Sequence, residues 1–195
     1  IAIGTGLAAL VMLRRDTRRD DLLASLLLCV SILTSSMGLA FAAGGAVALL
    51  LRKPGMSIGL GAVARRLAVV APPVAIFAVW WLIWGSDAES SLSLRNLVDS
   101  PEYVFNAYRT AASGLTGTFR IGGDLGTWVT AVTAVAVAAA VVVRVKRAGR
   151  VPAEMLVALA AALTFWGLAA LNFNELRPYD QSRYQVPGAI FVLMV

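Results

Sequence analysis

The sequence predicts an all-α fold, a polytopic bundle of transmembrane helices, and two observations lead to this prediction. Mean hydropathy is +0.78, with 59% hydrophobic and only 14% charged residues, which lies outside the usual balance of a soluble domain. The apolar residues also gather in runs near the length at which a helix crosses a hydrocarbon core, about 20 residues for about 30 Å. We therefore expect an integral membrane protein.

Six apolar runs follow one another along the chain, at 1–13, 22–51, 67–84, 125–143, 151–171 and 187–195. The third, fourth and fifth runs have the length of one membrane-spanning helix. The first and last runs begin and end with the chain itself, so we expect a piece of a longer protein. The prediction is one transmembrane domain over 1–195, with about five to seven membrane segments.

The run 22–51 is too long for one ordinary span. As a single helix it would measure about 45 Å, which requires a tilt steeper than transmembrane helices usually show. The segment "TSSMG" at 34–38 lies in its middle and offers hydroxyls for freed backbone groups and a glycine that can adopt positive φ. We predict a helical hairpin that turns at 34–38, with a single tilted helix as the alternative.

The distribution of Lys and Arg favours the hairpin. Twelve of the 17 basic residues form three groups of four: Arg14, Arg15, Arg18 and Arg19; Arg52, Lys53, Arg65 and Arg66; and Arg144, Lys146, Arg147 and Arg150. A single crossing by 22–51 divides the basic residues almost equally between the two sides, whereas a hairpin puts all three groups on one side, as the positive-inside rule expects. In a multi-pass protein of the cell membrane, the predicted cytoplasmic loops are then 14–21, 52–66 and 144–150, and the predicted outer loops are 85–124 and 172–187.

A surface helix is predicted at about 101–115, inside the first outer loop. Ser100 is a candidate N-cap, and Pro101 suits the first helical position. Apolar residues recur at helical spacing on one face, and polar residues face elsewhere: Val104, Ala107, Tyr108, Ala111, Ala112 and Leu115 against Asn106, Arg109, Thr110 and Ser113. Such a helix is expected to lie flat on the outer membrane surface, or to cover the bundle beneath it.

Tryptophans and acidic residues also mark the first outer loop. The segment "WWLIW" at 80–84 and Trp128 stand at its two ends, at the height of an aromatic belt. Five carboxylates lie between or beside them: Asp87, Glu89, Asp99, Glu102 and Asp124. We expect these carboxylates to be solvated rather than catalytic.

The stretch "NELRPYDQSRYQVPG" at 174–188 gathers charged and aromatic residues between two apolar runs, with Pro187 in position to start the next helix. Two explanations are open for its arginines. They snorkel to the interface and pair with neighbouring acids, or they hold the phosphate of a lipid-linked substrate by paired hydrogen bonds. We favour the second, because the outer side is otherwise poor in basic residues and charge near membrane depth is costly. The candidate lipid-phosphate ligands are Arg183, Tyr184 and Arg177.

Four segments resemble a known family. "SRYQVPGAIFVLMV" resembles the segment that opens a late transmembrane helix in actinobacterial multi-pass proteins of the GT-C superfamily of glycosyltransferases, especially the family 39 type. "LTSSMGLAFAAGGAVALLLRKP", "VVAPPVAIFAVWWLIWG" and "NAYRTAASGLTG" are similar to the same proteins. The resemblance implies transfer of a sugar from a polyprenyl-phosphate donor on the outer face, by an inverting displacement with a carboxylate base.

The same resemblance leaves the catalytic residue unassigned. In that superfamily the catalytic acid lies in the first outer loop, which we expect to precede Ile1. Arg183 and Tyr184 match the late-helix segment, whereas Arg177 is added on physical grounds alone. The chain has no histidine and one cysteine, which excludes a His base and a His or Cys metal cluster, so no metal or cofactor is predicted.

Two other classes of protein stay open as alternatives. A transporter or flippase would use the glycines Gly44, Gly45, Gly59 and Gly61 and the broken run 22–51 as features of a discontinuous helix. A non-catalytic membrane scaffold would have no affinity for lipid phosphate. The predicted partners are membrane lipids and a polyprenyl-phosphate sugar donor. Nucleic acid is not among them, because topology explains the basic groups.

Overall fold

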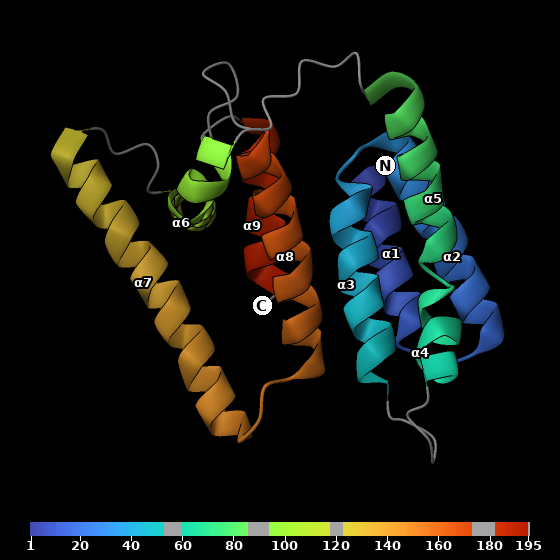
Figure 1. The fold of residues 1–195 in the computed structure, drawn as a ribbon. Helices are drawn as coiled ribbons and strands as arrows, with labels where there is room; N and C mark the ends of the chain where they lie inside the picture. The colour runs from blue at the N-terminus through green and yellow to red at the C-terminus, as the bar shows by residue number, and fades with distance from the viewer. Residues whose placement is uncertain (53–59, 86–93, 118–122, 173–181, 195) are drawn as a thin grey trace. The chain divides into compact units, whose positions relative to one another are not determined.

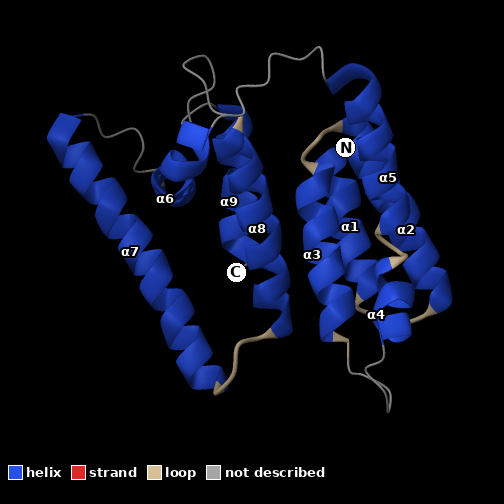
Figure 2. Cartoon of the chain, in the orientation of Figure 1, coloured by secondary structure: helices blue, strands red, loops and turns tan. Residues whose placement is uncertain are grey.

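The computed structural model describes residues 1–52, 60–85, 94–117, 123–172 and 182–194. Within these ranges every regular element is a helix and no strand occurs (Figure 2). The elements are α1 (Ala2–Leu13), α2 (Arg18–Thr34), α3 (Gly38–Leu51), α4 (Leu60–Leu67), α5 (Ala71–Trp80), the π-helical turn η1 (Trp81–Gly85), α6 (Leu94–Thr116), α7 (Gly123–Ala148), α8 (Ala153–Leu171) and α9 (Ser182–Met194). The predicted all-α class is confirmed.

The helices form two compact units, Ile1–Ser90 and Ser91–Val195, and each is described by itself. In the first unit, α1 packs against both α2 and α3, and α2 also packs on α5 (Figure 1). The core between them contains large side chains that are almost fully buried: Leu13, Leu28, Phe41 and Leu49. The single transmembrane domain over 1–195 stays a prediction.

The run 22–51 is broken where the sequence predicts a break. Helix α2 ends at Thr34 and α3 begins at Gly38, and the two helices pack against each other as a hairpin. Hydroxyl groups satisfy backbone groups at the turn. Thr34 Oγ1 donates to two carbonyls of the preceding turn, at 2.9 and 3.0 Å, and Ser35 Oγ accepts from the N–H of Met37 at 3.3 Å.

Gly38 has a different role from the predicted one. Its φ is not positive, so the turn does not depend on a left-handed conformation. A Cβ at this position would instead lie 2.5 Å from the backbone nitrogen of Ile32. Glycine is required here because α3 starts against the backbone of the last turn of α2.

Arg52 ties together three helix ends of the first unit. Its guanidinium donates to both carboxylate oxygens of Asp21, at 2.6 and 3.0 Å, and twice to the carbonyl of Leu13, at 2.6 and 3.2 Å. Asp16 lies 3.2 Å from the same group, and Arg66 Nη1 donates to the carbonyl of Arg52 at 2.9 Å. The end of α1, the start of α2 and the end of α3 therefore meet, which brings the first basic group to the same end of the unit as Arg52 and Arg66.

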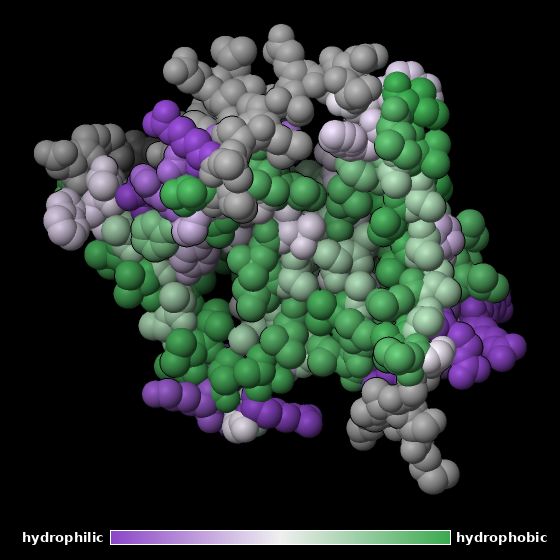
Figure 3. All heavy atoms as spheres, in the orientation of Figure 1, coloured by the Kyte–Doolittle hydropathy of each residue, from purple (hydrophilic) through white to green (hydrophobic). Residues whose placement is uncertain are grey.

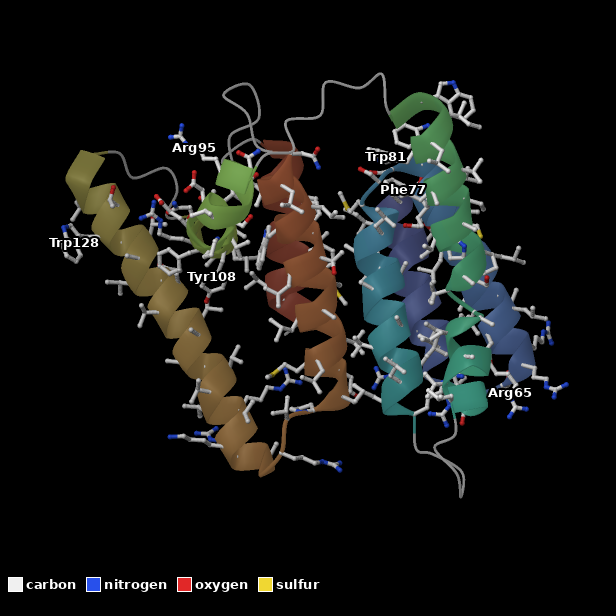
Figure 4. All side chains as sticks on the ribbon, in the orientation of Figure 1. Arg65, Phe77, Trp81, Arg95, Tyr108 and Trp128 are labelled. Carbon is white, nitrogen blue, oxygen red and sulfur yellow. The ribbon has the colours of Figure 1, made fainter. Side chains whose placement is uncertain are left out.

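The tryptophans of the first unit lie at its other end. Hydrophobic side chains cover the sides of its helices in Figure 3, and hydrophilic ones gather at the lower end. Figure 4 shows Arg65 at that lower end and Phe77 and Trp81 at the upper end. Trp80 and Trp84 are 48% and 57% exposed. Aromatic and basic residues thus occupy opposite ends, the arrangement expected of an aromatic belt and a cytoplasmic basic rim.

The predicted span at 67–84 is shorter than expected. α4 ends at Leu67, and the next helix runs over Ala71–Gly85, 15 residues. Pro72 and Pro73 occupy its first turn. Because proline has no N–H to donate, it suits the start of a helix better than its interior, and the apolar run is divided there.

The second unit contains the two described helices that are long and apolar enough to cross a membrane, Leu125–Ala148 within α7 and the whole of α8. α7 continues through Arg144, Lys146 and Arg147, three of the four basic residues of the third group, and is followed by Gly149, whose φ of 66° is left-handed. α8 and α9 pack together, and α6 contacts α7, α8 and α9. In Figure 1 α6 is seen nearly end-on while the other three run up the view, so α6 crosses them. The bundle of about five to seven membrane segments stays a prediction.

Two predicted helix starts are wrong. α6 begins at Leu94 rather than near Pro101, and α9 begins at Ser182 rather than at Pro187, so both prolines lie inside helices. Ser100 does not cap α6, because its hydroxyl donates back to the carbonyl of Asn96 at 2.6 Å. An internal proline removes one backbone donor and crowds the carbonyl four residues earlier, and both helices pack against other helices of their unit, which favours the helical conformation in spite of that cost.

The apolar face predicted for α6 is buried over most of its length. Ala107, Ala111 and Ala112 are 4%, 1% and 0% exposed. Leu115 is 37% exposed, whereas Ser113, predicted to face away, is 2% exposed, with its hydroxyl donating to a backbone carbonyl at 2.8 Å. α6 therefore covers the other helices of its unit, and its position flat on a membrane stays a prediction.

Candidate functional site

The three candidate phosphate ligands belong to the segment that leads into α9. Arg183 and Tyr184 follow Ser182 in the first helical turn. The backbone of these two residues is described and their side chains are not. Arg177 lies outside the described residues. The site is therefore located by the start of α9 and by the helices that pack on it.

The first turn of α9 lies level with the end of α8. A Cβ on Gly188 would lie 3.2 Å from Trp166 Nε1, so these two positions face each other. The helices run in opposite directions (Figure 1), and Arg183 and Leu171 each lie five residues away from that contact toward the same end. At 1.5 Å per residue both are displaced by about 7.5 Å. Arg183 thus stands beside the C-terminal end of α8.

Helix α6 contacts α8 near its C-terminal end. The Tyr108 hydroxyl (Figure 4) donates a hydrogen bond to the carbonyl of Ala134 on α7, at 2.6 Å. The Tyr108 ring contacts the ring of Trp166 on α8 edge-on, with the ring centroids 6.2 Å apart. Asn96 Nδ2 donates to the carbonyl of Leu171, the last residue of α8, at 3.1 Å. α6 consequently touches both the end of α8 and the helix that carries Arg183.

Glycine allows α6 to approach α9 closely. A Cβ on Gly188 would lie 3.1 Å from the Cβ of Ala111, closer than most side chains pack. Both residues are buried. The crossing of α6 and α9, defined by Ala111, Trp166 and Gly188, is therefore built from small residues around one indole ring.

The backbone at the start of α9 favours an anion. The first four N–H groups of a helix have no intrahelical acceptor, and the helix dipole places partial positive charge there. Arg183 adds a full positive charge to this turn. Hydrogen bonding of a phosphate or carboxylate is the chemistry that such a turn supports.

The outer carboxylates show no catalytic arrangement in the described ranges. Asp99 is 58% exposed at its side chain and lies 3.6 Å from Arg95, a solvated pair one helical turn apart. Glu102 is exposed. Asp87 and Glu89 lie outside the described residues, and the side chain of Asp124 is not described. No residue is assigned as a catalytic base.

Arg109 is a functional candidate that sequence reasoning missed. Its Nε is buried and makes no hydrogen bond with the part of the chain that the structure describes. The sequence predicts it on the polar face of α6, where an arginine is ordinarily solvated. The neighbouring position Ser113 is buried as well, so that face is not a solvent face. The sequence does contain one sign of this burial, because Arg109 is the only charged residue between 103 and 116.

Of the glycines that suggest transport, the buried pair Gly44 and Gly45 lies in the packed core of the first unit, whereas Gly61 is exposed. A Cβ on Gly45 would lie 3.1 Å from Leu13 Cδ1, and Gly44 and Gly45 are both buried within the first unit. Gly61 has nothing within 4 Å, and Gly59 lies outside the described residues. Close packing of α3 accounts for the buried pair.

The described ranges contain no group of three or more His, Cys, Asp or Glu side chains that could hold a metal ion. No protein-family model, curated protein or solved structure matches this chain.

Proposed function

We propose that the chain belongs to an integral membrane glycosyltransferase-like protein, which transfers a sugar from a polyprenyl-phosphate-linked donor on the outer face of the membrane. Arg183 holds the lipid phosphate through the two parallel donors of its guanidinium, and Arg177 adds a second positive charge. Tyr184 packs at the interface and offers a hydroxyl. Positive groups at this position stabilise the phosphate as it leaves the sugar.

The start of α9 is the observation on which the proposal rests. Arg183 and Tyr184 lie in its first turn, beside the C-terminal end of α8. α8 has 19 residues and a length of about 28 Å, close to the thickness of a hydrocarbon core. The basic residues at the end of α7 precede the opposite end of α8. If α8 crosses the membrane, Arg183 stands at the headgroup level opposite the basic group.

The resemblance to GT-C glycosyltransferases supplies the reaction class, and the physical chemistry of the site is compatible with it. Transfer from a lipid phosphate requires a base for the acceptor and cations for the leaving phosphate, and arginine serves the second role without histidine or cysteine. The catalytic carboxylate comes from another part of the protein. A carboxylate in a first outer loop preceding Ile1 would match the proposal.

Binding of the donor tests the role of Arg183. We expect Arg183→Lys to weaken binding of a radiolabelled polyprenyl-phosphate sugar, because lysine keeps the charge and loses the planar fork. Arg183→Ala should weaken binding further, by roughly ten- to hundredfold for each charge-assisted contact of about 1.5 to 3 kcal/mol. Tyr184→Phe should cost less, because the ring is kept.

Arg95→Ala is the matched control, since Arg95 is 90% exposed and, among the described residues, pairs with Asp99 of its own helix. Its donor affinity should equal that of the wild-type protein. Wild-type affinity in both Arg183 variants, at unchanged expression, would instead identify the segment as a membrane anchor, with lysine snorkelling as well as arginine.

A further inference from the structure

Three arginines at the lower end of the first unit have no described partner. Arg15, Arg18 and Arg19 are exposed and make no ion pair with the described residues, although three aspartates lie within the same short segment. Those aspartates are engaged elsewhere. Asp21 and Asp16 pair with Arg52, and Asp20 accepts from Thr17 Oγ1 at 2.7 Å.

The stability of α2 does not explain these arginines. Arg18 and Arg19 are the first two residues of the helix, next to the positive end of its dipole, where cations are unfavourable. The helix start is already capped, because Thr17 Oγ1 accepts from the N–H of Asp20 at 3.1 Å and Asp20 and Asp21 occupy the first turn. Neither helix capping nor ion pairing with the described residues therefore accounts for the position of these three charges.

An exposed apolar stripe runs up α2 directly from these arginines. Leu22, Leu26, Val30 and Leu33 recur at helical spacing and are 69%, 63%, 41% and 70% exposed. The stripe ends about 21 Å from Arg19 along the helix axis. Water is a poor solvent for such a surface, whereas lipid chains cover it and bring phosphate groups to the level of the arginines.

We propose that Arg15, Arg18 and Arg19 form a binding site for anionic phospholipid headgroups, with the stripe of α2 against the acyl chains. Arg15 lies in the turn between α1 and α2, and Arg18 and Arg19 are the first two residues of α2, so the three charges lie close together at one end of the stripe. The inference rests on membrane insertion in the proposed function and is independent of glycosyl transfer. Single-stranded RNA is the competing polyanion, but it leaves the apolar stripe uncovered.

Retention of lipid by the full-length protein tests the site. The protein is inserted into vesicles of equal phosphatidylglycerol and phosphatidylcholine and extracted in mild detergent, and the two lipids that copurify are quantified. We expect enrichment of phosphatidylglycerol at low salt, about fivefold for each arginine near the surface, and loss of enrichment at about 1 M salt. The triple variant R15Q/R18Q/R19Q should lose most of it, and the triple lysine variant should keep it.

Single variants supply a matched comparison. Arg18→Gln should lower the enrichment, whereas Arg95→Gln, at another exposed arginine, should leave it unchanged. Equal retention of the two lipids by the wild-type protein would overturn the proposal, as would full enrichment in the triple glutamine variant. Tighter binding of a labelled single-stranded RNA to the same three arginines, without lipid enrichment, would also overturn it.

Two further outcomes distinguish the failure of this lipid site from the failure of the proposed membrane insertion. A protein that does not enter the vesicles would defeat membrane insertion and this site together, whereas insertion without lipid preference would defeat this site alone. If the triple glutamine variant does not fold, the salt dependence of the wild-type protein and the lysine variant decide, because a charge-based site must be salt-sensitive and must tolerate lysine.

Discussion

Arg52 shows how one residue organises the end of a helical unit. The last carbonyls of a helix lack intrahelical donors, and that of Leu13 receives two hydrogen bonds from the Arg52 guanidinium. The hydrogen bond to Asp21 is the main cause that raises the pKa of Arg52 above its ordinary value. The side chain is only 12% exposed, so its charge depends on these partners.

Removing Arg52 should therefore destabilise the first unit. Arg52→Ala leaves the partly buried carboxylate of Asp21 and the carbonyl of Leu13 unpaired, and we expect the free energy of unfolding to fall by about 3 kcal/mol. Thermal unfolding of the full-length protein in detergent, followed by circular dichroism, measures the change. Arg65→Ala is the control, because Arg65 is exposed and donates only to Gly61 of its own helix. That variant should lie within about 0.5 kcal/mol of wild type, and an equal loss in both would refute this role of Arg52.

At the scale of elements, glycine and alanine decide how closely the helices of the second unit approach. The crossing of α6 and α9 leaves little room for a side chain at Gly188, since a Cβ would lie 3.1 Å from the Cβ of Ala111 and 3.2 Å from Trp166 Nε1, so these neighbours would have to move by a few tenths of an ångström. Gly167, on α8, has nothing within 4 Å of the same position. Two glycines inside helices thus have opposite tolerance for a methyl group.

Gly188→Ala should lower the free energy of unfolding by about 1 to 3 kcal/mol, because the added methyl group overpacks the crossing. Gly167→Ala should be neutral or stabilising by about 0.5 to 1 kcal/mol, because alanine is the better helix former. Chemical unfolding of both variants in the same detergent gives the comparison. Equal stability of the two would mean that α6 and α9 do not pack at Gly188.

The loss of stability caused by a new charge on α6 should be larger at a buried position than at an exposed one. Ala111→Glu places a carboxylate at a position that is 1% exposed, so we expect loss of the folded second unit. Leu115→Glu, at a position that is 37% exposed, should cost far less. Limited proteolysis and expression level report the difference, and similar sensitivity at both positions would contradict the packing described for α6.

Sequence reasoning located the helices better than their ends. The turn at 34–38 could be predicted, because its hydroxyls and its central place in an overlong run are visible in the sequence. The starts of α6 and α9 could not, since Pro101 and Pro187 have the residue type of a first helical position and only packing shows that the helices begin earlier. The contacts of Arg52 join residues 31 and 39 positions apart, which no local pattern reveals.

The candidate site could be predicted in part. Charge near membrane depth and the resemblance to the late-helix segment indicate Arg183 and Tyr184, and the backbone of α9 adds that they share a first turn beside the end of α8. The crossing at Gly188 could not be foreseen, because it depends on which face of α6 meets α9. The burial of Arg109 Nε could not be foreseen either, because it also depends on which face of α6 packs against the other helices.

For the whole molecule, the hairpin of α2 and α3 determines where charge lies. Because α1, α2 and α3 alternate in direction, the arginines at the end of α1 and the start of α2 meet Arg52 at the end of α3. Trp81, directly after α5, lies at the opposite end (Figure 4). In a membrane, the basic end of the first unit would lie on one side and its aromatic end on the other. We predict that the third basic group, at the end of α7 and directly after it, lies on the basic side.

Labelling of single cysteines in intact cells tests this topology most directly. In a full-length protein with Cys29→Ala, cysteines are introduced one at a time at Ser57, Ser86, Gly149 and Asn174 and probed with an impermeant thiol reagent. We expect labelling at Ser86 and Asn174 only, with Ser57 and Gly149 labelled after the cells are opened. Labelling of Ser57 and Gly149 in intact cells, without Ser86, would contradict the predicted orientation and with it an outer phosphate site at Arg183.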